Sequence, residues 1–76
     1  MNPEITVYTL PVCPKCNEMK ETLREAGLEF TFKDLEDYDN YAELLLSQVT
    51  FTEAPIVKIN GHFFDYVGAK EHLNLN

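Results

Sequence analysis

The chain opens with a short segment in which apolar and polar positions alternate. Ile5–Thr9 places Ile5 and Val7 on one side and is rich in β-branched residues, a pattern that predicts a strand. Leu28–Lys33 shows the same alternation, with Phe30 and Phe32 separated by a polar residue, and predicts a second strand. Because a helical segment lies between them, the two strands are expected to be parallel.

Between these strands the apolar positions change to helical spacing. The recurrence predicts a helix over Pro14–Ala26. Proline suits the first helical position, and Gly27 is the expected cap beyond the C-terminus. The apolar residues at this spacing are Met19, Leu23 and Ala26.

A second helix is predicted after the acidic segment that follows the second strand. Asp37 or Asp39 can cap its N-terminus. The Leu44–Leu46 run is expected to face the core rather than a partner, and Thr50–Ala54 is expected to be a loop that ends at Pro55. The apolar stripe of this helix comprises Tyr41, Leu44, Leu45 and Gln48 or Val49.

The rest of the chain predicts a hairpin and a short last helix. Ile56–Ile59 and His62–Phe64 are short strands, joined by the strong two-residue turn signal Asn60-Gly61. The last helix is indicated by the spacing of Ala69, His72 and Leu73. The order β-α-β-α-β-β-α predicts an α/β fold in which helices flank a mixed four-stranded sheet.

Length and charge limit the classes of protein to which the chain can belong. Its 76 residues are enough for one domain, 1–76, which we expect to be monomeric. The 13 Asp and Glu against 6 Lys and Arg give a net charge of −7, which disfavours nucleic acid and anionic membranes. No apolar run approaches the roughly 18 residues of a transmembrane helix, and the N-terminal residues lack a signal-peptide pattern. We therefore expect a cytoplasmic protein.

Candidate chemistry is concentrated in the two cysteines, Cys13 and Cys16, which form a Cys-Pro-Lys-Cys motif between a predicted strand and a predicted helix. This context is typical of a redox-active dithiol. At the helix N-cap, the Cys13 sulfur can accept hydrogen bonds from the free N–H groups of the first turn. The helix dipole and the charge of Lys15 also favour a thiolate there. Cys13 is therefore predicted to attack a substrate disulfide, and the less exposed Cys16 to resolve the mixed disulfide.

Other interpretations fit two cysteines at this spacing. A structural disulfide would stabilise the fold by only about 2 kcal/mol. A zinc site could use Cys13, Cys16, His62 and His72, although the two histidines are too far apart for a common zinc-ligand spacing. A metal ion held by the two cysteines is a further alternative. The thiols could also be inert, or the domain could be a metal-binding or interaction module without turnover. We expect no tightly bound cofactor and no resident metal.

These residues together resemble a small glutaredoxin-like protein of the thioredoxin-fold superfamily, with a CPxC dithiol. The matching segments are Val7-Tyr8-Thr9, Cys13-Pro14-x-Cys16 and Ala54-Pro55-x-Val57-x-Ile59-Asn60-Gly61. The resemblance implies a thioredoxin-like fold in which Pro55 is cis beside the cysteine pair. It also implies that the backbone of Ala54 pairs with the substrate chain or with glutathione. We expect Lys15 to influence partner preference and Tyr66 to flank the substrate groove.

The proteins that this chain resembles form two branches, which differ in their electron source. Members that use glutathione carry an aromatic residue at the position of Lys15, and after the hairpin a glycine pair that residues 64–71 lack. The other branch is reduced by thioredoxin reductase and donates electrons to ribonucleotide reductase, but its usual tryptophan-containing stretch is absent because the chain has no Trp. The expected function is a dithiol–disulfide oxidoreductase acting on protein or small-molecule disulfides. Glutathione or thioredoxin reductase is the expected electron source, and ribonucleotide reductase a candidate partner.

Overall fold

The computed structural model describes residues 3–48 and 54–75. Within them the elements follow in the predicted order: β1 (Ile5–Thr9), α1 (Pro14–Glu25), β2 (Thr31–Asp34), α2 (Tyr38–Leu46), β3 (Ile56–Ile59), β4 (His62–Phe64) and α3 (Tyr66–Leu73). None of the helices in the described ranges is long and apolar enough to cross a membrane.

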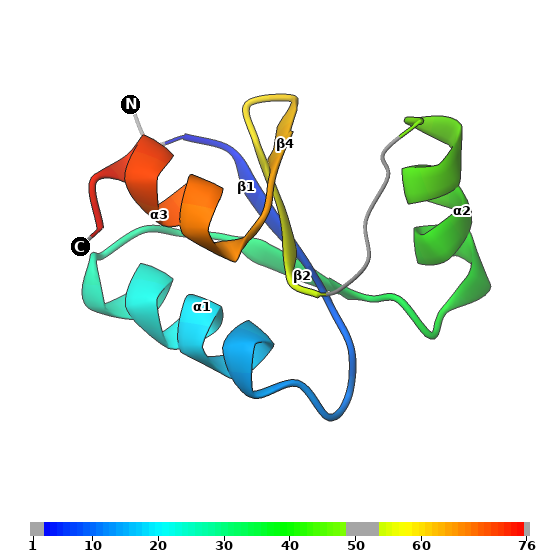
Figure 1. Ribbon diagram of the computed structural model, residues 1–76, viewed down its shortest axis with the longest axis horizontal. Coiled ribbons are helices and arrows are strands. Elements are labelled where there is room, and N and C mark those ends of the chain that lie inside the picture. The colour runs from blue at the N-terminus through cyan, green and yellow to red at the C-terminus, as the bar shows by residue number, and fades with distance from the viewer. Residues whose placement is uncertain (1–2, 49–53, 76) are drawn as a thin grey trace.

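The strands form one mixed sheet in the order β2-β1-β3-β4. β1 runs parallel to β2 and antiparallel to β3, and β4 pairs antiparallel with β3, as predicted. α1 and α3 lie on one side of the sheet and α2 on the other (Figure 1). The antiparallel register pairs Tyr8 of β1 with Ile56 of β3, so the end of β1 and the start of β3 lie at the same end of the sheet. The N-terminus of α1 lies near the same end, because α1 follows β1 in the chain.

The sheet separates two apolar clusters, because successive side chains of a strand point to opposite faces. Ile5 and Val7 of β1 join the larger cluster beneath α1 and α3, whereas Tyr8 points to the smaller cluster beneath α2. Each fully buried aliphatic side chain contributes about 1.5–3 kcal/mol of transfer free energy. The larger cluster contains Ile5, Val7, Met19, Leu23, Val57, Ile59 and Ala69, and the smaller one Tyr8, Leu35, Leu44 and Ile56.

β2 begins later than the predicted Leu28–Lys33 strand. Gly27 has a φ of +73° and caps α1 as expected, and the Leu28 N–H donates to the Leu23 carbonyl at 3.0 Å. The backbone of Leu28 therefore closes the helix instead of joining the sheet. Phe32 is an exposed residue of the edge strand, and the Lys20 ammonium lies 4.6 Å from its ring centre.

The hairpin turn has the predicted geometry. Asn60 and Gly61 both adopt positive φ, of 50° and 88°, as a two-residue type I′ turn requires. Asn60 also ties the turn to the start of β1, because its N–H donates to the Glu4 carbonyl and its side-chain oxygen accepts the Glu4 N–H.

The prediction that Leu44–Leu46 faces the core is wrong for two of the three leucines. Leu44 is fully buried, but Leu45 and Leu46 are exposed. Asp37 is the N-cap of α2, its side chain accepting the Asp39 N–H at 2.9 Å. The helix ends before Gln48, and Val49 and the loop residues 50–53 lie outside the described residues.

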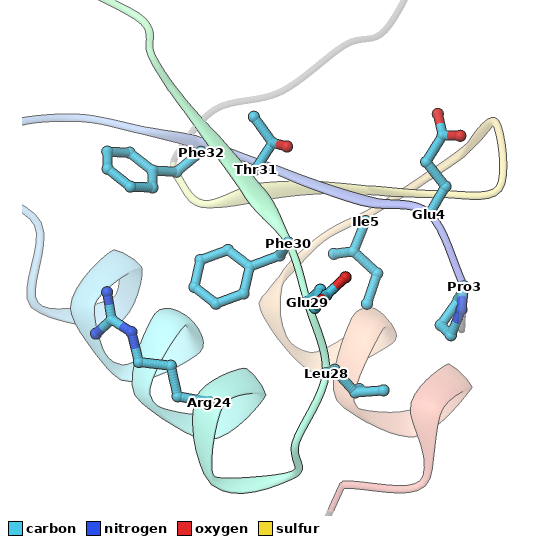
Figure 2. Close-up of a pocket in the computed structure, with 9 residues that line it drawn as sticks. All are labelled: Pro3, Glu4, Ile5, Arg24, Leu28, Glu29, Phe30, Thr31 and Phe32. Atoms are coloured by element: carbon cyan, nitrogen blue, oxygen red, sulfur yellow. The ribbon is translucent and has the colours of Figure 1, made fainter. Parts of the chain in front are cut away.

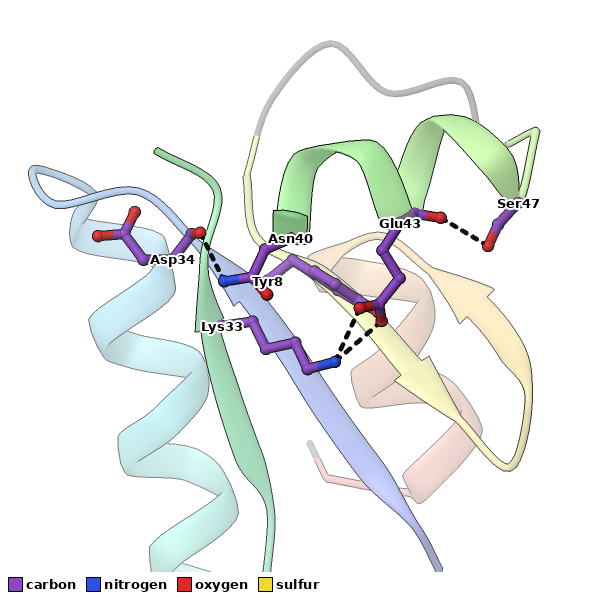
Figure 3. A network of polar contacts seen from close by, with 6 residues as sticks. All are labelled: Tyr8, Lys33, Asp34, Asn40, Glu43 and Ser47. Carbon is purple, nitrogen blue, oxygen red and sulfur yellow. Dashed lines mark hydrogen bonds and ion pairs between the residues drawn. The ribbon is translucent and has the colours of Figure 1, made fainter. Parts of the chain in front are cut away.

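A polar network explains the orientation of α2 (Figure 3). The Tyr8 hydroxyl donates to the Glu43 carboxylate at 2.6 Å, and the Lys33 ammonium donates to both carboxylate oxygens at 2.9 and 3.0 Å. Burial and the hydrogen bond to Glu43 raise the pKa of Tyr8, while the hydrogen bonds from Tyr8 and Lys33 lower the pKa of Glu43. Glu43 can satisfy both donors only if this side of α2 faces the sheet, which turns Leu45 and Leu46 outward.

Candidate active site

The first turn of α1 holds the cysteine pair. Cys13 has extended backbone angles and is the N-cap of α1, and its Sγ accepts the Cys16 N–H at 3.1 Å. Pro14 follows at the first helical position, where a missing N–H costs nothing. The predicted capping role of Cys13 is confirmed, and the sulfur lies where free N–H groups and the helix dipole favour negative charge.

The two cysteines differ in accessibility. Cys13 is half-buried, whereas Cys16 is buried among the core residues. The two are joined as a disulfide, with their Cα atoms 5.2 Å apart. Cys13 is therefore the more accessible cysteine of the pair.

The segment before β3 lies directly beside Cys13. The Ala54–Pro55 peptide bond is cis, as the resemblance implied, and Pro55 is buried. Cys13 Sγ lies 3.8 Å from the Ala54 carbonyl oxygen. The register of β1 against β3 brings these distant residues together, since it aligns the end of one strand with the start of the other.

Lys15, which lies between the two cysteines in the sequence, contacts Tyr66 of α3. The Lys15 ammonium lies 5.5 Å from the centre of the Tyr66 ring, and the Tyr66 hydroxyl donates to the Glu18 carboxylate at 3.3 Å. The Lys70 ammonium lies 5.2 Å from the same ring centre. Sequence reasoning missed Glu18 and Lys70. Their only signal is helical spacing, since Glu18 follows Lys15 by three residues and Lys70 follows Tyr66 by four.

This meeting of two lysines on one ring stands out in an acidic chain. Among residues 3–48 and 54–75, all six cationic side chains lie 4.6 to 6.0 Å from an aromatic ring centre, and only the Tyr66 ring has two of them. The cations are Lys15, Lys20, Arg24, Lys33, Lys58 and Lys70.

The segment after the hairpin caps the N-terminus of α3. Asp65 is the N-cap, and its Oδ1 accepts the Gly68 N–H at 2.6 Å. A Cβ atom at Gly68 would lie 2.8 Å from this same oxygen, so glycine at position 68 leaves room for the cap. The Asp65 carboxylate is thus engaged within the chain.

Other features lie apart from the cysteines. A groove of about 610 Å³ runs along the edge strand and is lined by residues 3–5, Arg24 and residues 28–32 (Figure 2). The cysteine pair contributes nothing to its lining. Within residues 3–48 and 54–75, no three His, Cys, Asp or Glu side chains gather to hold a metal ion. The four-ligand zinc site considered from the sequence is therefore not assembled, and His62 and His72 are both exposed.

A Cys-Pro-Lys-Cys disulfide at a strand-to-helix junction, next to a cis-proline, defines a thiol–disulfide protein of the thioredoxin-like fold. The family model described as glutaredoxin matches residues 5–64. The chain belongs to the glutaredoxin family, which implies a thiol–disulfide redox function.

Solved structures support the same fold. The thioredoxin-like protein BC3987 is 27% identical and matches over 96% of this chain and 100% of its own, with a TM-score of 0.80. NrdH-redoxin from Escherichia coli is 23% identical over 96% of this chain and 95% of its own, with a TM-score of 0.75. Glutaredoxin 1 from Francisella tularensis is 18% identical over 97% and 98%, with a TM-score of 0.72. No curated protein sequence matches significantly.

Proposed function

We propose that the protein is a dithiol–disulfide oxidoreductase in which Cys13 is the nucleophile and Cys16 the resolving thiol. One observation carries this proposal: Cys13 Sγ is the N-cap acceptor of α1 and is partly accessible, while Cys16 is buried behind it. The N–H of Cys16 and the free end of the helix stabilise a thiolate on Cys13 more than a thiol.

The reaction consists of two exchanges. The Cys13 thiolate attacks one sulfur of the substrate disulfide, forms the mixed disulfide and releases the first substrate thiolate, which takes up a proton. The Cys16 thiol then loses its proton and attacks Cys13 Sγ, which forms the Cys13–Cys16 disulfide and releases the second substrate thiol. The substrate gains two electrons, and an external dithiol or two thiols restore the reduced pair.

The neighbouring residues form the substrate groove in this proposal. Next to the cis bond, the Ala54 backbone can pair with an extended substrate segment, and Pro55 forms the adjoining wall. Lys15 and Tyr66, whose side chains contact each other, also border the groove in this proposal and contact the groups that flank the substrate disulfide.

Glutathione is the electron source we propose, following the family. Reduction by thioredoxin reductase is the second candidate, because residues 64–71 lack the glycine pair that follows the hairpin in members that use glutathione. The solved NrdH-redoxin is described as having a thioredoxin-like activity profile. Ribonucleotide reductase is the partner to test with either electron source, and a cytoplasmic location is part of the proposal.

The test is NADPH oxidation with a small disulfide substrate, coupled either to glutathione and glutathione reductase or to thioredoxin reductase. We expect turnover with one system, loss of turnover in Cys13→Ser, and accumulation of a mixed disulfide in Cys16→Ser, visible as an added mass. Lys15→Gln should lower the turnover, because Lys15 borders the proposed substrate groove. Lys20→Gln, in the same helix, is the matched control and should leave the turnover unchanged.

Each outcome separates the candidates. Full dithiol turnover in Cys13→Ser would show that the nucleophile is assigned wrongly. Turnover with thioredoxin reductase alone would select the second electron source. A further outcome is no turnover with either system and one metal ion per chain after purification under reducing conditions. That result would refute the oxidoreductase proposal and favour a metal-binding module.

A further inference from the structure

The amphipathic pattern of α2 is inverted relative to the sheet. The residues by which α2 contacts the sheet side are largely polar: Glu43 binds Tyr8 and Lys33, and the Asn40 amide donates to the Asp34 carbonyl at 2.9 Å (Figure 3). Leu44 is the buried residue of the helix. An ordinary surface helix shows the reverse, with apolar side chains inward and polar ones outward.

The opposite side of α2 is apolar and exposed. Tyr38 is 76% exposed, Leu45 54% and Leu46 85%. Tyr38 and Leu45 are seven residues apart and therefore lie on one stripe of the helix, with Leu46 beside it. We call these three residues the outward face of α2. In the described part of the chain nothing covers them, and a contiguous exposed apolar surface on a small protein is typical of an interaction site.

The charged residues beside the outward face of α2 indicate which kind of partner can bind there. Glu36, Asp37 and Asp39 are exposed at the N-terminal end of α2, and the whole chain carries a net charge of −7. A second copy would place like charges against each other, and an anionic membrane would be repelled. A surface with an apolar centre and basic surroundings complements both features.

We propose that the outward face of α2 is a docking surface for an amphipathic helix of another protein whose apolar stripe is bordered by Lys or Arg. The apolar stripe packs against Tyr38, Leu45 and Leu46, and the cations face the carboxylates at the N-terminal end of the helix. Because α2 lies on the sheet face opposite α1, docking leaves Cys13 accessible (Figure 1). The partner thus binds this protein without occupying its disulfide site.

A synthetic probe tests the surface directly. The probe is a fluorescent 18-residue helical peptide with Leu along one side and Lys along the other, measured by anisotropy at about 0.15 M salt, where long-range attraction is screened. We expect saturable binding that weakens at least tenfold in Leu45→Gln/Leu46→Gln, since glutamine keeps the helix propensity but removes the apolar contact. Val67→Gln is the matched control, because Val67 of α3 is 57% exposed, and it should bind unchanged.

Four controls can overturn the proposal. A scrambled peptide of the same composition that binds equally well would reduce the effect to charge attraction. A dimer in sedimentation that dissociates in the double variant would assign the surface to a second copy. Co-sedimentation with phosphatidylcholine vesicles that is lost in the same variant would assign it to lipid. A tenfold slower reduction of the Cys13–Cys16 disulfide by dithiothreitol under saturating peptide would place the probe over the cysteines and contradict the separation of the two sites.

Discussion

Two leucines two positions apart in α2 should respond very differently to truncation. Leu44 is fully buried against a cluster that includes Tyr8 and Ile56, whereas Leu46 is 85% exposed. Leu44→Ala loses its apolar transfer energy and leaves a cavity, which costs about 2–4 kcal/mol. Leu46→Ala changes an exposed helical position and should alter the free energy of unfolding by no more than about 0.5 kcal/mol.

The scale of the whole fold makes this difference easy to measure. At about 0.05–0.15 kcal/mol per residue, a chain of 76 residues has an unfolding free energy of about 4–11 kcal/mol. Leu44→Ala therefore removes a large fraction of it and should lower the Tm by at least about 8 °C. Urea denaturation followed by circular dichroism at pH 7 measures both variants, with an unchanged slope as the check for two-state unfolding.

The comparison also tests the orientation of α2 on which the docking proposal depends. If Leu46→Ala destabilises the protein as much as Leu44→Ala, the helix is rotated relative to the structure described here. The outward face of α2 would then be part of the core, and the proposed docking surface would not exist.

Further predictions concern the polar contacts that fix α2 and α3. Tyr8→Phe should cost about 1–2 kcal/mol in urea denaturation, because a hydrogen bond to a carboxylate is lost. Because the pKa of Tyr8 is raised in the folded protein, its contribution to the free energy of unfolding is fully present below about pH 10, the pKa of an unfolded tyrosine. This contribution is lost as the pH rises through the pKa of the folded state, so Tyr8→Phe should flatten the alkaline side of the stability profile. An unchanged profile would show that Tyr8 does not cause the alkaline loss of stability. The lowered pKa of Glu43 works in the opposite direction, with stabilisation present above its unfolded value and lost as the pH falls through the folded one, so Glu43→Gln should flatten the acid side of the profile. Asp65→Ala should cost about 0.5–2 kcal/mol by thermal unfolding and Asp65→Asn much less, since asparagine can still accept the Gly68 N–H; equal losses would show that the cap is not the reason.

Local chemistry made much of this protein predictable from its sequence. The β-α-β-α-β-β-α order follows from apolar spacing, and Gly27, Asn60 and Gly61 mark turns because their backbone conformations have positive φ. The cysteine pair is equally local: a proline at the first helical position and a cysteine before it define an N-cap, wherever the helix is placed in the fold.

The failures concern features that depend on partners far away in the sequence. The alternating pattern around Leu28 predicts a strand, but the Leu28 backbone closes α1. The apolar run also predicts that Leu45 and Leu46 face the core, although both are exposed. The run cannot reveal that Glu43 bonds with Tyr8, 35 residues away, and with Lys33.

The elements, their turns and the redox motif can thus be predicted from the sequence alone, since spacing, capping and φ preference depend on neighbouring residues. The side of α2 that faces the sheet depends on the tertiary structure, and so do the contacts of Ala54 with Cys13 and of Lys15 with Tyr66. The physical reason is that these contacts arise from strand register and from hydrogen bonds between separate elements. No local pattern of apolar and polar residues records either of them.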